Sequence, residues 1–230
     1  MQKNIIIIGA NDSLAGQVIN FLPLNLKKKI KCVIYDRKLV KKKKTKINLK
    51  IETVNKKKIF GYNFLQVTSF KDFFKKQKIN QAYLLVECNF QRQKIYEEIK
   101  SFVKFLTYIH PSTILSGKNV LGDGSILFPG SYVGYKANIG KLTIIQSNCT
   151  IEHHNEIGDF CNLAPKVTTG GFTEIENFCN INISANIINR VNVAENCIIG
   201  AGSLILKNTS PNGLYFGIPA KRISNNKKAT

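Results

Sequence analysis

The second half of the chain carries a six-residue repeat that few folds can accommodate. Counting in steps of six from Ile109 to Ile205 gives 17 positions, of which 16 are aliphatic and only Thr169 is not. Neither the 3.6-residue period of a helix nor the two-residue period of an ordinary strand produces such a series. We therefore predict that each hexad is one short strand and a corner, with the aliphatic side chain pointing into a narrow core.

A second register supports this interpretation, because small side chains recur four residues after the aliphatic ones. Four of the six cysteines fall in it: Cys149, Cys161, Cys179 and Cys197. We interpret them as compact core residues. The chain has no Cys-x-x-Cys pair and no disulfide-rich composition, so we expect neither a metal site nor a disulfide framework.

The first half has a different pattern, in which apolar runs alternate with helical segments. A strand, a helix and a second strand in succession predict a parallel sheet. Ser69 and Asp72 have the spacing of a capping box that opens a further helix. The expected elements are strands at 3–9, 30–36 and 81–88, and helices at 13–22 and from Phe90 to about Phe105, the latter capped by Asn89.

The charge is concentrated in the same half. The chain has 34 Lys and Arg against 14 Asp and Glu, and residues 1–108 hold 24 of the former and 7 of the latter. Only four of the 34 are Arg, the residue that grips phosphates and bases bidentately. A solvated lysine-rich surface is therefore favoured over a field that attracts polyanionic small molecules, and both are favoured over nucleic-acid binding.

The chain shows no sequence feature of membrane insertion or export. The longest aliphatic run, Ile5 to Ile8, is far shorter than the roughly 20 apolar residues of a membrane span. The segment from Met1 lacks a signal peptide's layout. We expect a cytoplasmic protein without a membrane span.

Several local motifs resemble those of the hexapeptide-repeat sugar O- and N-acetyltransferases of the sialic-acid and bacillosamine type. They are Ile151-Glu152-His153 within the repeat, Ile157-Gly158-Asp159-Phe160 after it, Ile109-His110-Pro111 at the junction, and Gly217-Ile218-Pro219-Ala220-Lys221 near the end. The segment from Val86 to Tyr96 also resembles the family's last strand and helix before the repeat. The resemblance covers nearly the whole chain.

The resemblance implies an architecture and an assembly. Residues 1–108 would form a Rossmann-like α/β domain that binds a nucleotide sugar. Residues 109–208 would form a left-handed parallel β-helix with three hexads per coil, and 209–230 a C-terminal tail. The family also implies acetyl-CoA as co-substrate, no metal, and a homotrimer.

The resemblance also assigns roles to residues of the repeat. His153 matches the general base. From the residues alone, two surface histidines are the favoured interpretation of His153 and His154, although imidazole is suited to proton abstraction near neutrality. Glu152 and His154 flank the base. The positions that match the acetyl-CoA site are Gly171 beside the thioester, Ile183 and Ala201 along the pantetheine arm, Lys221 near the phosphates, and Asn162.

Four positions depart from the family pattern. His154 stands where relatives commonly have Asp or Glu, Gln146 where they have Asn, and Asn162 where a second His is frequent. The loop after the first strand, Gly9 to Gly16, replaces a Gly-Gly-His-Gly-like loop. Glu152 or Glu156 could supply the missing carboxylate.

The acceptor is expected at the first domain, where a glycine turn opens a helix N-terminus suited to a diphosphate. The acceptor-binding candidates are Gly9, Asn11, Asp12, Ser13, Asp36, Asn89, Arg92 and Gln146. An acid that closes the second strand, as Asp36 does, often meets a ribose hydroxyl in nucleotide-binding folds.

Together these features predict an acetyl-CoA-dependent N-acetyltransferase acting on the amino group of a nucleotide-linked amino sugar, for surface-glycan synthesis. O-acetylation of a sialic-acid-type sugar is an alternative in the same class. A non-catalytic β-helix used for binding or assembly is an alternative in another class, favoured by the departures around His153.

Overall fold

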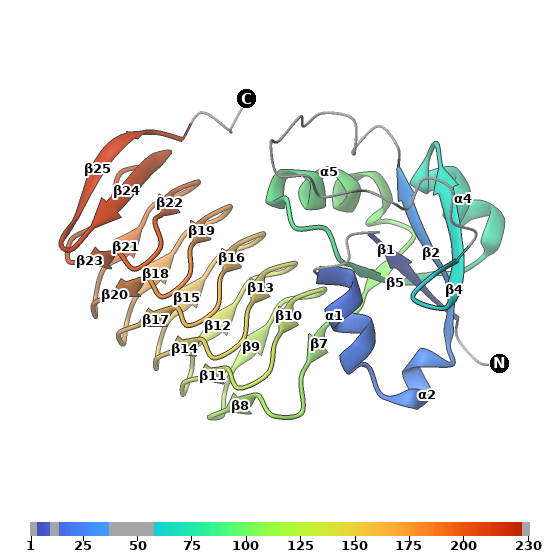
Figure 1. Cartoon of the computed structure of the whole chain (residues 1–230), viewed down its shortest axis with the longest axis horizontal. Coiled ribbons are helices and arrows are strands. Elements are labelled where there is room, and N and C mark those ends of the chain that lie inside the picture. The colour runs from blue at the N-terminus through green and yellow to red at the C-terminus, as the bar shows by residue number, and fades with distance from the viewer. Residues whose placement is uncertain (1–3, 10–13, 37–57, 227–230) are drawn as a thin grey trace. The chain divides into compact units, whose positions relative to one another are not determined.

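The computed structural model describes residues 4–9, 14–36 and 58–226. The chain divides into two compact units, Met1–Leu106 and Thr107–Thr230. Each unit is described by itself. Helices and strands are labelled in Figure 1.

The first unit is built on one six-stranded sheet. Its strand order is β3 (Lys58–Ile59), β4 (Tyr62–Val67), β2 (Ile30–Asp36), β1 (Ile5–Ile8), β5 (Gln81–Leu84), β6 (Lys104–Phe105). All neighbours are parallel except β3, which pairs antiparallel with β4. The four isoleucines of β1 are fully buried, as a central parallel strand requires. The sheet order reverses between β1 and β5.

Within residues 4–9, 14–36 and 58–106, the helices are α1 (Leu14–Phe21), α2 (Leu24–Lys27), α4 (Phe70–Gln77) and α5 (Asn89–Ile99). The capping prediction for α4 is confirmed, because the Ser69 hydroxyl accepts from the Asp72 backbone N–H at 3.1 Å. Two details of α5 were predicted wrongly. Asn89 is the first residue of α5 rather than its cap. The helix ends at Ile99 and not near Phe105, because Lys104–Phe105 forms a strand that pairs with β5.

The second unit is a β-helix of 17 two-residue strands, β7 to β23, one for each predicted hexad. Face 1 holds β7 (Tyr108–Ile109), β10 (Ile126–Leu127), β13 (Ile144–Ile145), β16 (Asn162–Leu163), β19 (Asn180–Ile181) and β22 (Ile198–Ile199). Face 2 holds β8 (Ile114–Leu115), β11 (Tyr132–Val133), β14 (Thr150–Ile151), β17 (Thr168–Thr169), β20 (Asn186–Ile187) and β23 (Leu204–Ile205). Face 3 holds β9 (Val120–Leu121), β12 (Asn138–Ile139), β15 (Glu156–Ile157), β18 (Glu174–Ile175) and β21 (Asn192–Val193). The predicted architecture, an α/β domain followed by a β-helix, is confirmed.

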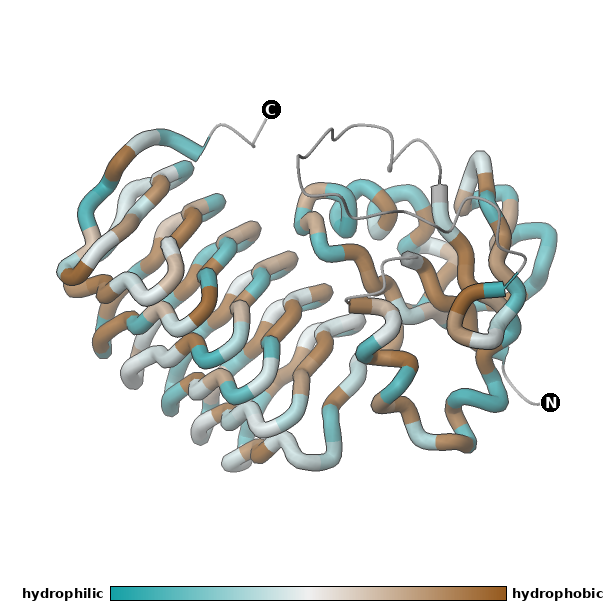
Figure 2. The backbone as a smooth tube through the Cα atoms, viewed as in Figure 1, coloured by the Kyte–Doolittle hydropathy of each residue, from teal (hydrophilic) through white to brown (hydrophobic). Residues whose placement is uncertain are grey.

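The repeat fills the centre of the coils as predicted. Each position of the six-residue series that starts at Ile109 is the second residue of its strand. From Leu127 to Ile205, all of these residues are buried. The four cysteines of the small-residue register are free and buried. Burial raises the pKa of the Cys149 thiol to about 12, so this group stays protonated and serves as packing. Apolar colour recurs at each coil in Figure 2.

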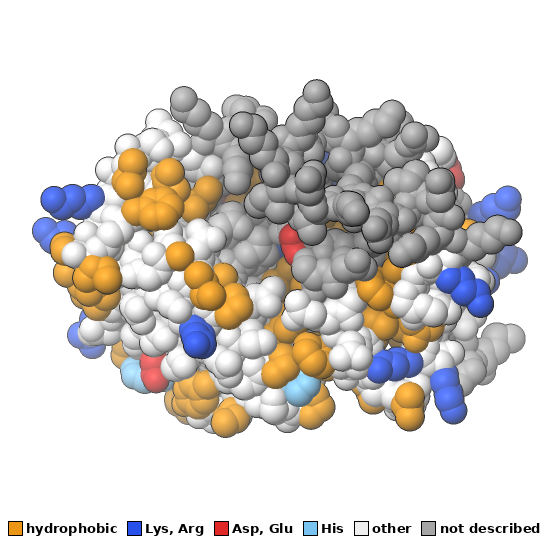
Figure 3. All heavy atoms as spheres, in the orientation of Figure 1, with side chains coloured by type: hydrophobic (Ala, Val, Ile, Leu, Met, Phe, Trp, Pro, Cys, Tyr) orange, Lys and Arg blue, Asp and Glu red, His pale blue; other side chains and the backbone are white. Residues whose placement is uncertain are grey.

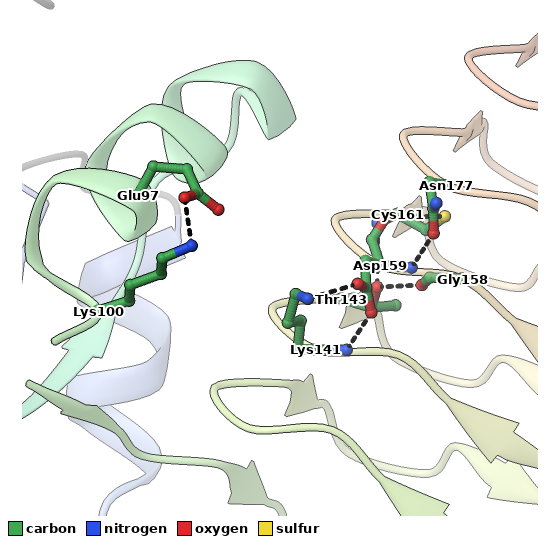
Figure 4. A network of polar contacts seen from close by, with 8 residues as sticks. All are labelled: Glu97, Lys100, Lys141, Thr143, Gly158, Asp159, Cys161 and Asn177. Carbon is green, nitrogen blue, oxygen red and sulfur yellow. Dashed lines mark hydrogen bonds and ion pairs between the residues drawn. The ribbon is translucent and has the colours of Figure 1, made fainter.

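Every corner between faces except the first has the same backbone conformation. The third residue of the corner is left-handed, as at Leu142, His154 and Phe172, with φ of 52°, 56° and 58°. The corner between face 3 and face 1 is closed by its own side chains (Figure 4): Asp159 accepts from the backbone N–H of Lys141 at 2.9 Å and pairs with its ammonium group. Glu97 of α5 and Lys100, which follows the last residue of that helix, form an ion pair in the first unit and are drawn in the same view.

The segment expected as a tail continues the second unit. β24 (Gly213–Gly217) pairs in parallel with β22 and so extends face 1, and β25 (Ala220–Asn225) folds back antiparallel on β24. The closing sequence Gly217 to Lys221 forms the turn of this hairpin and the start of β25.

Candidate active site

His153 and His154 lie at the corner between face 2 and face 3, hereafter the catalytic corner. His153 is exposed and His154 is half-buried. Successive coils place the residues one turn above and below them, so the column contains Tyr135, then the two histidines, then Gly171 and Phe172. The backbone holds the column together: His154 N–H donates to Tyr135 O at 2.9 Å, and Phe172 N–H donates to His153 O at 3.0 Å.

The two imidazoles contact each other. Their Nδ1 atoms are 3.1 Å apart, and the rings are nearly perpendicular, with centroids 5.3 Å apart. His154 stacks on Phe172 with a centroid distance of 4.7 Å and 13° between planes, and the edge of Tyr135 approaches it at 5.9 Å. His154 is therefore held between aromatic rings from the two adjacent coils.

Gly171 lies against the face of the His153 ring. A Cβ added at Gly171 would lie 2.5 Å from Cε1, 2.6 Å from Nε2 and 3.1 Å from Nδ1 of His153. Only a glycine therefore lets the imidazole keep this position. In the described part of the chain, the backbone N–H of Gly171 donates no hydrogen bond, so it is free to bind a ligand oxygen.

Neither glutamate considered as a replacement carboxylate contacts the imidazole of His153. The Glu152 carboxylate accepts from the backbone N–H of His153 at 3.4 Å, and Glu156 accepts from the side chain of Asn138 at 2.8 Å. The polar partner of the His153 ring is His154.

Two polar residues that the sequence analysis did not assign to the site hold the catalytic corner. Thr169, the single break in the aliphatic register, is fully buried, and its hydroxyl accepts from the Glu152 backbone N–H at 3.2 Å. The buried Asn155 side chain donates to Gly170 O at 2.8 Å and to His153 O at 3.4 Å. The interruption of the repeat was the signal that could have identified Thr169.

The other acetyl-CoA candidates lie at different places on the second unit. Ile183 and Ala201 are exposed at equivalent positions of consecutive coils, on the corner between face 1 and face 2. Asn162 lies on face 1 and donates to Asn180 at 2.8 Å, and Gln146 begins the face 1 to face 2 corner. Lys221 is exposed in β25. Within one chain, the structure brings His153, His154, Glu152 and Gly171 together and leaves Ile183 and Ala201 on another corner.

In the first unit, Gly9, Asp36 and Asn89 follow or close β1, β2 and β5, so their backbones share the carboxyl edge of the sheet beside the β1–β5 reversal. This edge is where open α/β sheets bind ligands. Gly9 has a φ of +130°, and a Cβ there would meet Leu85 O at 2.1 Å. Asn11, Asp12 and Ser13 lie outside the described residues.

Arg92 is placed differently from the other acceptor candidates. Its side chain is fully buried and donates to the carbonyls of Val86 at 2.8 Å and Glu87 at 2.9 Å. It thereby holds the turn between β5 and α5.

Three further observations delimit the site. A hollow of about 310 Å³ in the first unit is lined by β2, β4 and α4, and its β2 residues, Lys31 and Cys32, begin that strand, away from the carboxyl edge. Among the described residues, no three or more His, Cys, Asp or Glu side chains are grouped to hold a metal ion. No described helix is long and apolar enough to cross a membrane.

Comparison with known proteins places this geometry in context. No family model matches the chain. GDP-perosamine N-acetyltransferase of Escherichia coli O157:H7 is 24% identical over 163 residues, which is 70% of this chain. The match covers 64% of that relative, so the chain spans just under two thirds of its length.

Solved structures match over nearly the whole chain. PerB from Caulobacter crescentus, in complex with CoA and GDP-perosamine, has a TM-score of 0.81 at 20% identity and covers 97% of this chain and 99% of that one. The acetyltransferase domain of PglB from Neisseria gonorrhoeae, in complex with acetyl coenzyme A, has a TM-score of 0.75 at 18% identity, covering 97% and 100%. WeeI from Acinetobacter baumannii has a TM-score of 0.74 at 19% identity, covering 96% and 100%. The chain therefore has the fold of the hexapeptide-repeat acetyltransferases of the PerB and PglB kind, an N-terminal α/β domain followed by a β-helix.

Proposed function

We propose that the protein is an acetyl-CoA-dependent N-acetyltransferase acting on the amino group of a nucleotide-linked amino sugar. The observation that carries the proposal is the pairing of an exposed His153 with Gly171, whose lack of a side chain makes room for the face of the imidazole. The names of the similar proteins, GDP-perosamine N-acetyltransferase and a PerB complex with CoA and GDP-perosamine, support the same donor and acceptor class.

The chemistry is direct attack without an acyl-enzyme. The sugar amine attacks the thioester carbonyl, and Nε2 of His153 removes a proton from the amine as the new C–N bond forms. The tetrahedral intermediate then collapses by breaking the C–S bond, and the proton on Nε2 of His153 passes to the departing sulfur, so that CoA leaves as the thiol and the base is restored. The free N–H of Gly171 is placed beside the imidazole and suits the developing oxyanion.

The divided acetyl-CoA candidates support assembly of the site from two copies of the chain. Ile183 and Ala201 are on a different corner from His153, and the strands of face 2 lie between the two corners. A homotrimer in which the face 1 to face 2 corner of one copy lies against the catalytic corner of the next brings these residues to one acetyl-CoA molecule.

The test is thiol release from acetyl-CoA by the full chain, with UDP-, GDP- and dTDP-linked amino sugars and free sialic acid as acceptors. We expect turnover with one nucleotide-linked amino sugar and its loss in His153→Ala. Turnover with sialic acid alone would identify the O-acetyltransferase instead. A protein that binds no acetyl-CoA in calorimetry would be a non-catalytic β-helix.

A further inference from the structure

We propose that His154 is the positioning residue for His153, accepting the Nδ1–H of His153 through its own unprotonated Nδ1. This inference rests on the proposed role of His153 as the base. It assigns to a neutral imidazole the orienting role that a carboxylate commonly has in acid–base pairs with histidine.

The contact between the rings leaves room for only one hydrogen atom between Nδ1 of His153 and Nδ1 of His154. With the two Nδ1 atoms 3.1 Å apart, one imidazole donates and the other accepts. If His154 donated, the hydrogen of neutral His153 would be on Nε2, and that atom could not remove a proton. If His153 donates, its Nε2 carries the free lone pair, and Gly171 lies beside this atom.

The aromatic contacts fix the acceptor ring. Phe172 stacks on His154 and the edge of Tyr135 approaches it, while the backbone N–H of His154 is bonded to Tyr135 O. The lone pair on Nδ1 is thus held toward His153. When His153 takes up the substrate's proton, its Nδ1–H becomes a charge-assisted donor to this lone pair, which stabilises the product of the proton transfer.

A spectroscopic test needs neither substrate nor turnover. The chain has three histidines, so ¹⁵N-histidine labelling gives a spectrum that His110→Asn and His154→Phe variants can assign. At neutral pH we expect His153 protonated on Nδ1 and His154 protonated on Nε2. The reverse pair of tautomers, or no coupling between the two rings, would overturn the proposal even in an active enzyme.

A kinetic test uses residues that the corners of this chain already accept. Phe160 and Phe178 stack in consecutive coils at left-handed corner positions, so His154→Phe keeps the aromatic stack and removes only the acceptor. Asn148 and Asn196 occupy equivalent left-handed positions, so His154→Asn restores a neutral acceptor.

We expect kcat of His154→Phe to fall by about ten- to a hundredfold, with the KM for acetyl-CoA little changed, and His154→Asn to recover much of the loss. In His154→Asp, the carboxylate favours the protonated base, so the acidic limb of the kcat/KM profile moves to higher pH. Equal activities of the wild type and His154→Phe, or of the Phe and Asn variants, would contradict the assignment. An inactive wild type would instead refute the proposed function, and the labelling result would still decide the tautomers.

Discussion

At the scale of single residues, the catalytic corner depends on the absence of a Cβ atom at Gly171. Gly171 sits at a corner position that carries a side chain in the coils on either side, as His153 and Asn189 do. Its backbone does not have a φ in the left-handed region, so the fold itself does not require glycine there. The requirement comes from the imidazole that lies against it.

We therefore expect Gly171→Ala to separate activity from stability. The new Cβ would lie within 2.6 Å of two ring atoms, and because His153 is exposed its ring can rotate away. A displacement of about 1 Å can cost a hundredfold in rate, so kcat falls by about that factor while the melting temperature stays nearly constant. Asn189→Ala, which places alanine at the equivalent position one coil further on, is the control and leaves kcat unchanged.

At the scale of the coil, one irregular strand supports the site. In the other face 2 coils, the first corner residue donates to the register residue of the next coil, as Gly134 N–H does to Ile151 O and Gly170 N–H to Ile187 O. At the catalytic corner this hydrogen bond goes to the Thr169 hydroxyl instead. The backbone that carries His153 is therefore positioned by a side chain.

This arrangement predicts the effect of Thr169→Val, which completes the aliphatic register. The valine fills the same volume, and the Glu152 N–H can turn to the backbone carbonyl as in the other coils, so unfolding in urea changes by only about 1 kcal/mol. The corner shifts with that hydrogen bond, and we expect kcat to fall by about tenfold. Ile187→Val, in the next strand of face 2, should cost about 0.5–1.5 kcal/mol without a change in kcat. Full activity of Thr169→Val would show that the hydroxyl has no positioning role.

How much of the structure could be predicted depends on how local its causes are. The 17 strands follow from a repeat in which each hexad has the same environment. The place of Ile151 or Ile187 in its strand can therefore be predicted from the six-residue spacing alone. α5 was overextended because its end at Ile99 depends on the pairing of residues 104–105 with β5, which is not local. Likewise β4 has weak alternation, and the sequence does not reveal that Arg92 is buried with its guanidinium bonded to the carbonyls of Val86 and Glu87. The contact between His153 and His154 needs side-chain geometry that spacing does not contain.

At the scale of the whole molecule, an isolated chain leaves apolar surface uncovered. Ile114, Val120 and Ile183 of the β-helix have exposed fractions of 61%, 63% and 49%. Hydrophobic side chains also reach the surface on the face of the molecule in Figure 3.

We predict that the protein is a trimer in solution, in agreement with the division of acetyl-CoA candidates between two corners. Light scattering after gel filtration should give a mass about three times the 25.8 kDa of the chain. Mixing His153→Ala with an Ala201→Trp variant should then restore part of the activity, since a mixed trimer contains an intact pair of corners. A mass of one chain, or no recovery in the mixture, would place each site within a single chain.

Paired strands are separated by a constant step of 18 residues, as from Tyr132 to Thr150, so the length of the second unit increases by a fixed amount with each turn. Each turn adds roughly 4.8 Å along the axis and returns the chain to the same face. Duplicating one whole turn after Gly171 would lengthen the reach from His153 to Lys221 by about that amount without re-aiming any side chain. Inserting a single hexad would instead move every later residue to the next face, so length and orientation can change independently in such a chain.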